Sequence, residues 1–206
     1  INMLECQERD GIKLKIKNVF KHIKLVSKHK WIVFKLCCKI GMPFRGFMHD
    51  WSKFSPQEFW ESVKYYNGHE SPIITSKKEN GYSKAWLHHK GRNKHHPEYW
   101  IDVSLPRKTI LMPYQYAAEM VCDKLAAGIV YNGKAWNKDT QIKYYMKERE
   151  TAMIHPKLDE FLIEVFTEVS EKGLDETLTK NNIRRIYDKC CLGLERLDEN
   201  KIQAVG

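Results

Sequence analysis

Apolar residues recur at intervals of three and four positions through most of the chain, which is the spacing of one helix face. In the first such segment the apolar positions are Ile16, Val19, Phe20, Ile23 and Val26. They predict one long amphipathic helix, or two that abut, over residues 12 to about 40, ended by Gly41 and Pro43. Val, Ile and Thr never alternate with polar residues for long enough to predict a strand.

Cap and turn signals divide the rest of the chain. We predict a short helix over 44–51 and another from Pro56 to Tyr66, with Ser55 as N-cap and Glu58 returning to cap the backbone. Residues 67–80 lack periodicity and contain Gly and Pro, which predicts a surface loop. Further helices are expected over 81–96, from 113 to about 127, from about 140, over 156–172 and over 179–197. The fold class predicted is all-α, with one domain over residues 1–206.

Composition excludes several classes of protein. The 206 residues are 42% hydrophobic and 30% charged, as in one globular domain. No stretch approaches the roughly 18 apolar residues that span a bilayer, and the first residues lack the pattern of a signal peptide. The six cysteines include no C-x-x-C pair, so a zinc ribbon is not predicted. We expect a cytoplasmic protein with reduced thiols and no membrane partner.

Positive charge is concentrated at the front of the chain. The net charge is +9, and residues 1–50 hold 11 basic and 4 acidic side chains, whereas residues 151–206 hold 8 and 11. A cationic surface attracts phosphate-bearing ligands or nucleic acid. The lysines at 13, 17, 21, 24 and 28 also recur at helical spacing, which is typical of a solvated helix face.

Histidine and aspartate supply the candidate chemistry. His29 lies on the apolar stripe of the first helix, so its side chain is predicted to point into the core. Asp123 lies on a similar stripe, where an unpaired carboxylate is costly and pairing with a cation or metal is favoured. His49 and Asp50 are adjacent; because helix neighbours point about 100° apart, only a metal or ligand at a helix end gathers both. Nitrogen and oxygen donors of this kind suit Mn, Fe, Co, Ni or Zn.

The order of these residues resembles a known superfamily. His29, then His49-Asp50, then Asp123 is similar to the motif of the HD superfamily of metal-dependent phosphohydrolases. The segments that resemble an uncharacterised HD-related family of bacteria and phages are 49–56, 85–89 and 93–100. The resemblance covers about residues 16–131 and implies a helical bundle of the HD type, followed by a C-terminal helical extension over 139–200.

The resemblance also implies ligands for one or two divalent ions. They would be His29, His49, Asp50 and Asp123 for the first ion, with His89 and His96 for the second. On one continuous helix His89 and His96 would be two turns, about 10 Å, apart. They share an ion only if that helix ends or bends near Pro97; otherwise His95 or His96 would bind substrate phosphate.

The activity implied is hydrolysis of a phosphate monoester or diester by metal-activated water, with a nucleotide or a similar phosphorylated small molecule as substrate. Asp50, Lys53 and His89 would be catalytic. The substrate-binding residues would be Lys53, as a point charge on a phosphate oxygen, together with Arg92, His95 and His96.

Two alternatives stay open. A few HD proteins with two irons activate oxygen instead of hydrolysing phosphate, and six candidate ligands permit that chemistry. The chain would otherwise be a non-enzymatic nucleic-acid binder that uses the basic N-terminal half and the aromatic-basic run over 82–100, where Trp86, Tyr99 and Trp100 would stack on bases. The sequence predicts no oligomeric state.

Overall fold

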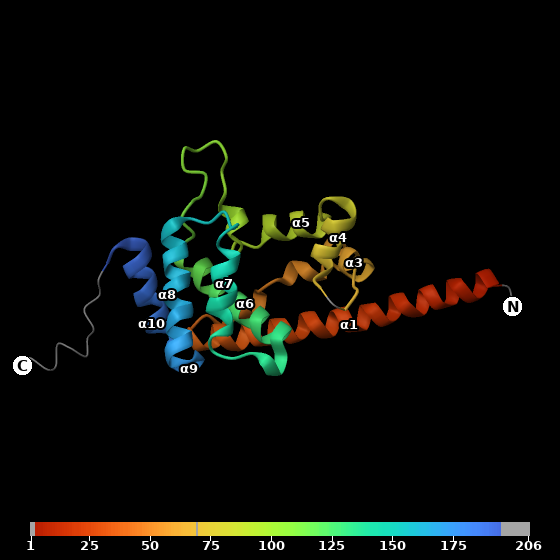
Figure 1. Cartoon of the computed structure of the whole chain (residues 1–206), viewed down its shortest axis with the longest axis horizontal. Coiled ribbons are helices and arrows are strands. Elements are labelled where there is room, and N and C mark those ends of the chain that lie inside the picture. The colour runs from red at the N-terminus through yellow and green to blue at the C-terminus, as the bar shows by residue number, and fades with distance from the viewer. Residues whose placement is uncertain (1–2, 69, 195–206) are drawn as a thin grey trace, which may run out of the picture.

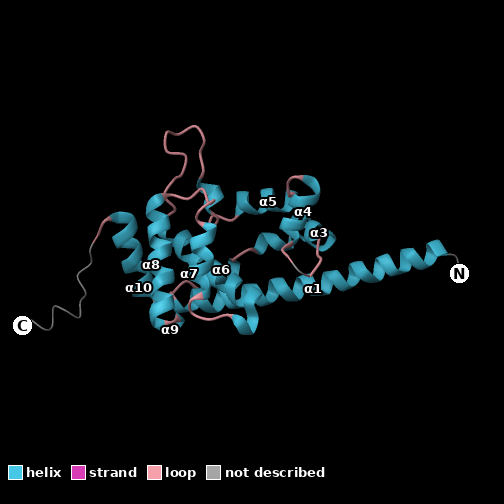
Figure 2. Ribbon diagram, in the orientation of Figure 1, coloured by secondary structure: helices cyan, strands magenta, loops and turns pink. Residues whose placement is uncertain are grey.

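The computed structural model describes residues 3–68 and 70–194. Within these ranges the chain forms helices joined by loops, with one isolated bridge between Ile101 and Thr109 and no strand (Figure 2). The predicted all-α class is therefore confirmed, and the described residues form a single domain.

The α-helices of the described chain follow in this order: α1 (Met3–Lys39), α2 (Pro43–Met48), α3 (Pro56–Lys64), α4 (Pro72–Asn80), α5 (Lys84–Arg92), α6 (Tyr114–Asn132), α7 (Thr140–Glu148), α8 (Pro156–Lys172), α9 (Leu174–Thr177) and α10 (Lys180–Tyr187). Three short 3-10 helices, η1 (Trp51–Phe54), η2 (Pro97–Trp100) and η3 (Gly133–Ala135), and a π-helical turn, η4 (Asp188–Leu192), complete the described elements.

Helix α1 runs along one side of the molecule, and its first turns extend beyond the other helices (Figure 1). The predicted long helix is one continuous element. Its C-terminal half packs with α6, α8 and α10 around an apolar core, while α3, α4 and α5 lie together further along α1. Large core side chains that are fully buried include Ile40, Leu125, Phe161, Phe166 and Ile186.

The predicted helix over 44–51 is wrong at its C-terminal end. Helix α2 ends at Met48, and Asp50 has a φ of 51° in the left-handed region. Helix α2 packs closely on α1 at Gly46, where a Cβ would lie 2.9 Å from the Phe34 Cα. His49 and Asp50 therefore lie on a turn at a helix end instead of on the helix.

The loop predicted over 67–80 is also wrong, because α4 occupies most of it. This helix has no regular apolar stripe, and side-chain hydrogen bonds hold it instead: the Ser76 hydroxyl donates to the Glu61 carboxylate at 3.0 Å. The predicted capping box is wrong too. Ser55 makes no capping hydrogen bond, and Glu58 is turned towards two histidines described below.

The helix predicted over 81–96 ends early, at Arg92. The Asn93 side chain bonds back to the last turn, where its amide donates to the His89 carbonyl oxygen at 2.9 Å. The Asn93 backbone leaves the helical region, with φ of −103° and ψ of 98°. The chain then reverses before η2, so that His95 and His96 face α5.

The C-terminal predictions agree closely with the structure. Helix α8 has the predicted bounds, and α7 begins at Thr140 as expected. The helix predicted over 179–197 is α10 followed by the π-helical turn, and its residues 195–197 lie outside the described residues, as do 195–200 of the predicted extension.

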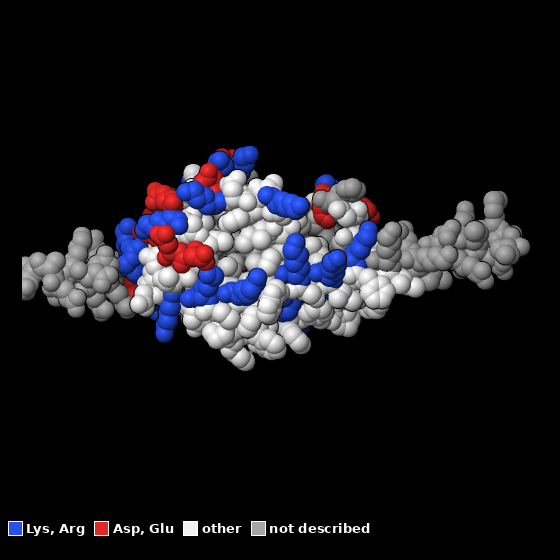
Figure 3. All heavy atoms as spheres, turned by 90° about the horizontal axis from the view of Figure 1, so that it is seen from below, with Lys and Arg blue, Asp and Glu red and all other residues white. Residues whose placement is uncertain are grey.

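One face of the molecule carries a row of basic side chains. Figure 3 shows Lys and Arg along the side that lies below in Figure 1, with most acidic side chains of that face towards its left end. Lys21, Lys24 and Lys28 are exposed on α1, as a solvated helix face requires, and the side chains of Lys13 and Lys17 lie outside the described part. None of the described helices has both the length and the apolar character needed to cross a bilayer.

Candidate metal centre

Three segments distant in sequence bring the first predicted ligand group together. Helix α1 positions His29, the turn after α2 positions His49 and Asp50, and α6 positions Asp123. His29 Nε2 lies 2.9 Å from Asp123 Oδ1, and His49 Nε2 lies 3.3 Å from both Asp123 Oδ1 and Asp50 Oδ2. His29 points into the interior, as its place on the apolar stripe predicts, and is 9% exposed.

The unusual backbone of Asp50 directs its carboxylate into this group. Aspartate adopts the left-handed conformation more readily than most residues, and here it precedes η1. The same turn brings Lys53 back, so that its Nζ lies 2.6 Å from Asp50 Oδ2. Asp50 is 1% exposed, and its charge is therefore balanced inside the protein.

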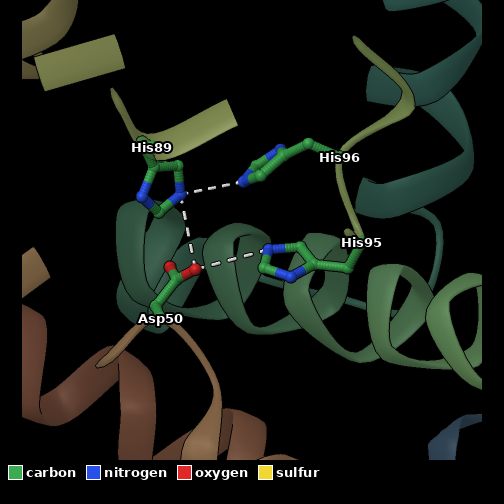
Figure 4. Close-up of side chains that lie close together, drawn as sticks. All are labelled: Asp50, His89, His95 and His96. Carbon is green, nitrogen blue, oxygen red and sulfur yellow. Dashed lines mark hydrogen bonds and ion pairs between the residues drawn. The ribbon is translucent and has the colours of Figure 1, made fainter. Parts of the chain in front are cut away.

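A second group lies on the other side of the Asp50 carboxylate (Figure 4). Asp50 Oδ1 lies 3.3 Å from His89 Nε2 and 3.4 Å from His95 Nε2. Since α5 ends at Arg92, His96 also reaches His89, with their Nε2 atoms 2.9 Å apart. His89 and His96 could share an ion only if their helix ended or bent near Pro97, and α5 does end before that residue.

His95 joins this second group, although the sequence predicted it only as a substrate-binding residue. Asp50, His89, His95 and His96 each offer one ligand atom, and these four atoms lie within 4.8 Å of one another, as do those of His29, His49, Asp50 and Asp123. Asp50 belongs to both groups. No local pattern distinguishes His95 from His96 as a ligand, because the difference depends on the chain reversal after α5.

Two buried glutamates orient the histidine rings. Glu119 accepts hydrogen bonds from Nδ1 of His49 at 2.9 Å and lies 3.3 Å from Nδ1 of His95. Glu58 accepts from Nδ1 of His89 at 2.7 Å and of His88 at 2.6 Å. Metal-binding histidines in proteins commonly donate their second ring nitrogen to a carboxylate in this way. The Nε2 atoms of His49, His89 and His95 consequently face the interior of the cluster.

Neither glutamate was predicted to take part in the site. Glu119 lies one helical turn before Asp123, so its place on the same face of α6 was visible in the sequence. Glu58 resembled a helix cap, and only the packing of α3 against α5 reveals its contact with His88 and His89.

Burial and charge act in opposite directions on the pKa values of the cluster. Burial lowers the pKa of His49, but the Asp50, Asp123 and Glu119 carboxylates raise it well above its ordinary value. Burial raises the pKa of Asp50, yet His49, Lys53 and His89 hold it well below. Burial likewise raises the pKa of Glu119, and hydrogen bonds from His49 and His95 lower it to about 2. The carboxylates are therefore ionised, and they stabilise the positive charges of His49 and Lys53 that lie among them.

Two histidines are instead kept neutral. Burial lowers the pKa of His29, against the opposing effect of Asp123. Burial and the neighbouring His95 hold the pKa of His96 well below its ordinary value. Neutral imidazole is the form that binds metal.

The residues present fit a divalent ion. The buried His49 Nε2, His95 Nε2 and Asp50 Oδ1 have no hydrogen-bond partner among the described residues, which is costly unless a ligand engages them. Atoms that share an ion at metal-ligand distances of 2.0–2.2 Å lie about 3.0–3.5 Å apart. Three pairs of the second group are close to this range, at 2.9, 3.3 and 3.4 Å, and all four atoms lie within 4.8 Å of one another. Imidazole and carboxylate donors without thiolate favour the ions from Mn to Zn.

Cavities adjoin the candidate ligands. One, of about 200 Å³, is lined by Lys53, His29, His89 and Asp123. A larger one, of about 490 Å³, contacts Asp123, His95 and His96 and continues along α6. The cluster is therefore buried but reachable by a small molecule.

Arg92, predicted to bind substrate, lies outside both of these cavities. Its side chain is exposed, and its Nε donates to His88 Nε2 at 2.7 Å. It lines a third cavity, of about 280 Å³, together with Arg45 and Lys94. Through His88 and Glu58, Arg92 is linked to His89, and the cavity that it lines also contacts His95 and Glu119 of the cluster.

The aromatic-basic run over 82–100 is divided between the interior and the surface of the protein. Trp86 is half-buried and packs on His89 and His96, with ring centroids 5.9 and 5.1 Å away. Trp100 packs against the apolar core, and its indole donates to the Lys94 carbonyl oxygen at 2.7 Å. Tyr99 is 39% exposed. Tyr82 is 49% exposed as well, so the run keeps two tyrosine rings at the surface.

One family model matches the part of the chain that contains the site. The model of a family of unknown function, DUF5662, matches residues 18–168, more than half of the chain. Every residue of the two ligand groups and both orienting glutamates fall within this range. Comparison with the curated proteins and with the solved structures gives no match.

Proposed function

This chain belongs to the family DUF5662, and we propose that it is a metal-dependent phosphohydrolase of the HD type, acting on a phosphate monoester or diester. The observation that carries the proposal is the position of Asp50 between two ligand groups. One carboxylate oxygen faces His89 and His95, and the other faces His49 and Lys53. Asp50 would therefore be a ligand available to either group.

One divalent ion would be held by His29, His49, Asp50 and Asp123, and a second by Asp50, His89, His95 and His96. Bound there, divalent ions supply a water molecule activated for attack on phosphorus and neutralise charge on the phosphoryl group. The orienting carboxylates of Glu58 and Glu119 keep the histidine Nε2 atoms directed inward, so little rearrangement is needed on binding.

Lys53 supports a phosphate substrate over other ligands. Burial lowers its pKa, but the charges of Asp50 and Asp123 raise it above its ordinary value, so the ammonium group stays protonated. It lines the smaller cavity beside His29 and His89. A fixed positive charge next to the ligand groups would bind a phosphoryl oxygen and stabilise the charge that develops there.

The test begins with elemental analysis of the purified full chain. We expect one or two equivalents of a transition metal, and phosphate release from a panel of phosphate esters after Mn²⁺, Ni²⁺ or Mg²⁺ is added to the metal-free protein. A matched pair, Lys53→Gln and the exposed Lys84→Gln, tests the phosphate contact, and only Lys53→Gln should lower kcat. Metal binding without hydrolysis of any ester would contradict the proposal.

A second candidate function, oxygen activation by two irons, rests on the three histidines of the second group, because imidazole suits iron as well as zinc. Elemental analysis and iron oxidation-state spectroscopy separate the two functions. Two bound irons that react with oxygen would favour the oxygenase, whereas a colourless site active with Mn²⁺ or Ni²⁺ would exclude it.

A further inference from the structure

Exposed aromatic side chains are concentrated where α1, α2 and η1 meet. Trp31, Phe47, Trp51 and Phe54 are each between 42% and 58% exposed. The ring centroids of Phe47 and Trp51 lie 6.1 Å apart, and those of Trp51 and Phe54 lie 5.9 Å apart. On α1, the ring of Trp31 stacks on that of Phe34 at 5.6 Å. These five residues form the aromatic patch.

Contacts between α1 and the next two elements make the aromatic patch continuous. Gly46 of α2 lies against Phe34, where a Cβ would be 2.9 Å from the Phe34 Cα. The Lys30 ammonium of α1 lies over the rings of η1, 5.2 Å from the centroid of Trp51 and 6.0 Å from that of Phe54. Apolar residues that are exposed singly are ordinary in proteins, whereas a contiguous patch marks a binding surface.

The exposed apolar surface continues along α1 towards its N-terminus. Phe20 and Ile23 are exposed, as is Trp31. At about 100° per residue, these three side chains project within an arc of about 80° around the helix axis. The exposed Lys24, Lys28 and Lys35 project within about the next 60° of the same side. One side of α1 therefore presents apolar and cationic side chains next to each other.

Acidic side chains are almost absent from this part of the chain. Residues 18–54 include eight Lys and Arg and one acidic residue, Asp50. Asp50 is buried in the candidate metal centre. Figure 3 shows the row of basic side chains along this side of the molecule, with uncharged surface below the row in that view. The surface of α1, α2 and η1 is therefore cationic and apolar, with no exposed carboxylate of its own.

The combination of charge and apolar area selects the partner of this surface. A nucleic acid would neutralise the lysines, but its own surface is charged, so Phe20 and Ile23 would stay in contact with water. A second copy of the chain would cover the apolar side chains, but it would bring two rows of like charge together. An anionic membrane surface accommodates both, because its headgroups attract lysines and the region beneath them accepts Trp, Phe and Ile side chains.

We propose that this surface binds the anionic face of a lipid membrane peripherally. Helix α1 lies along the headgroups, with Phe20, Trp31 and the rest of the aromatic patch in the interfacial layer and the lysines at the lipid phosphates. Peripheral binding needs no spanning helix, so it differs from the expectation of no membrane partner, which rested on the absence of a spanning stretch. It also does not depend on hydrolysis, because His29 projects into the core from the opposite side of α1.

Co-sedimentation of the purified full chain with lipid vesicles tests the proposal. One set of vesicles is phosphatidylcholine alone, and the other includes about one third phosphatidylglycerol, which supplies anionic headgroups. We expect binding to the anionic vesicles to be at least tenfold tighter than to the neutral ones, and to weaken at high salt. Equal binding to both kinds of vesicle, or binding to neither, would overturn the proposal.

A pair of matched double variants tests the lysine row. Lys24→Gln with Lys28→Gln removes two charges one helical turn apart on α1. Lys143→Gln with Lys147→Gln removes two exposed charges at the same spacing on α7. We expect the α1 variant to bind anionic vesicles at least fivefold more weakly and the α7 variant to bind as the wild type does. Equal binding by the two variants would contradict the proposal.

The apolar contribution is tested in the same way. Phe20→Ser with Trp31→Ser should weaken binding to anionic vesicles at least fivefold, whereas Tyr144→Ser with Met146→Ser, also exposed side chains, should leave it unchanged. Circular dichroism checks that each variant is folded. If the α1 variant does not fold, quenching by brominated lipid replaces it, and Trp31→Phe should reduce the quenching of tryptophan fluorescence. Unchanged binding, or no quenching in the wild type, would show that apolar side chains do not enter the membrane and would overturn the proposal.

Two further measurements identify the other occupants. Light scattering gives the mass of the wild type and of the variant at Phe20 and Trp31, and we expect the same mass for both. A wild-type dimer that dissociates in this variant would show that a second copy covers the aromatic patch. Duplex DNA that binds more tightly than anionic vesicles, with a loss in the variant at Lys24 and Lys28, would assign the lysine row to a nucleic acid. Either result would overturn the proposal.

Discussion

The two faces of α6 bury side chains for opposite reasons. On one face Ala118, Val121 and Leu125 pack against the apolar residues of α8 and α10. On the other, Glu119 and Asp123 meet histidines from α1, from the turn after α2 and from the segment after α5. The first face is buried because its side chains are apolar. The second face is buried although its carboxylates are charged.

The apolar face of α6 contributes to the stability of the fold, whereas the charged face is arranged for ligand binding. Burial of apolar area and close packing stabilise the fold directly. Buried ionised groups contribute little net stability, since desolvation offsets their attraction. The polar atoms left without partners in the histidine cluster cost free energy that a bound cation would recover. We therefore expect substitutions in the apolar core to change the free energy of unfolding and substitutions in the cluster to change ligand binding.

The largest effect is expected at the turn that carries His49 and Asp50. His49→Ala or Asp50→Ala should abolish metal retention and activity while the helical content stays largely intact, because the apolar core does not depend on them. Elemental analysis and circular dichroism check both parts, with the exposed Asp175→Asn as control. Full metal content in either variant would show that the site is assigned wrongly.

In the apolar core, Phe161→Ala should lower the free energy of unfolding by about 3–5 kcal/mol, because the removed ring leaves a cavity. Phe161 is 0% exposed and its ring packs 5.5 Å from that of Tyr187. Urea unfolding measures the change. If the variant lost metal while keeping its stability, the division between the two faces of α6 would be false.

The pH dependence of stability should reveal a histidine that is buried without a charge partner. Burial, followed by the charge of Lys53, lowers the pKa of His22 to about 4 from 6.5. Between pH 6.5 and 4 the unfolded chain binds a proton that the folded chain does not, so stability falls as the pH falls, by about 3 kcal/mol in total. His22→Phe should remove this loss in urea unfolding of the metal-free chain at pH 7 and pH 4.

Glu119→Gln should weaken metal binding by about 10–100-fold, since it removes the carboxylate that orients His49 and His95. The matched surface variant Glu164→Gln should bind metal as the wild type does. Metal titration of both proteins measures the ratio. An unchanged affinity in Glu119→Gln would mean that the histidine rings are oriented by packing alone.

The smallest effect is expected on the surface of the C-terminal helices. Lys189 Nζ lies 2.9 Å from Glu164 Oε2, and the Lys189 side chain is 51% exposed. Exposed ion pairs contribute about 0.2–1 kcal/mol. Lys189→Ala should therefore lower the free energy of unfolding by less than about 1 kcal/mol, and by less still at high salt.

The spacing of apolar residues predicted the helices that pack on the core. It failed for helices that are held or ended by side-chain hydrogen bonds. Helix α8 has the expected bounds, because Pro156 at its first turn and Gly173 at its end mark them locally. Helix α4 was missed because a side-chain hydrogen bond to another helix holds it instead of an apolar stripe. The early end of α5 was missed because the Asn93 side chain terminates it.

The sequence by itself determined the helical class and the inward direction of His29 and Asp123, because both follow from the 3.6-residue period of the chain around them. Only the tertiary structure decided which histidines face Asp50 and which carboxylates orient them. His95 enters the cluster through a chain reversal, and Glu58 reaches His89 through the packing of α3 on α5. Such contacts depend on where helices end and cross in space, which no local spacing of residue types specifies.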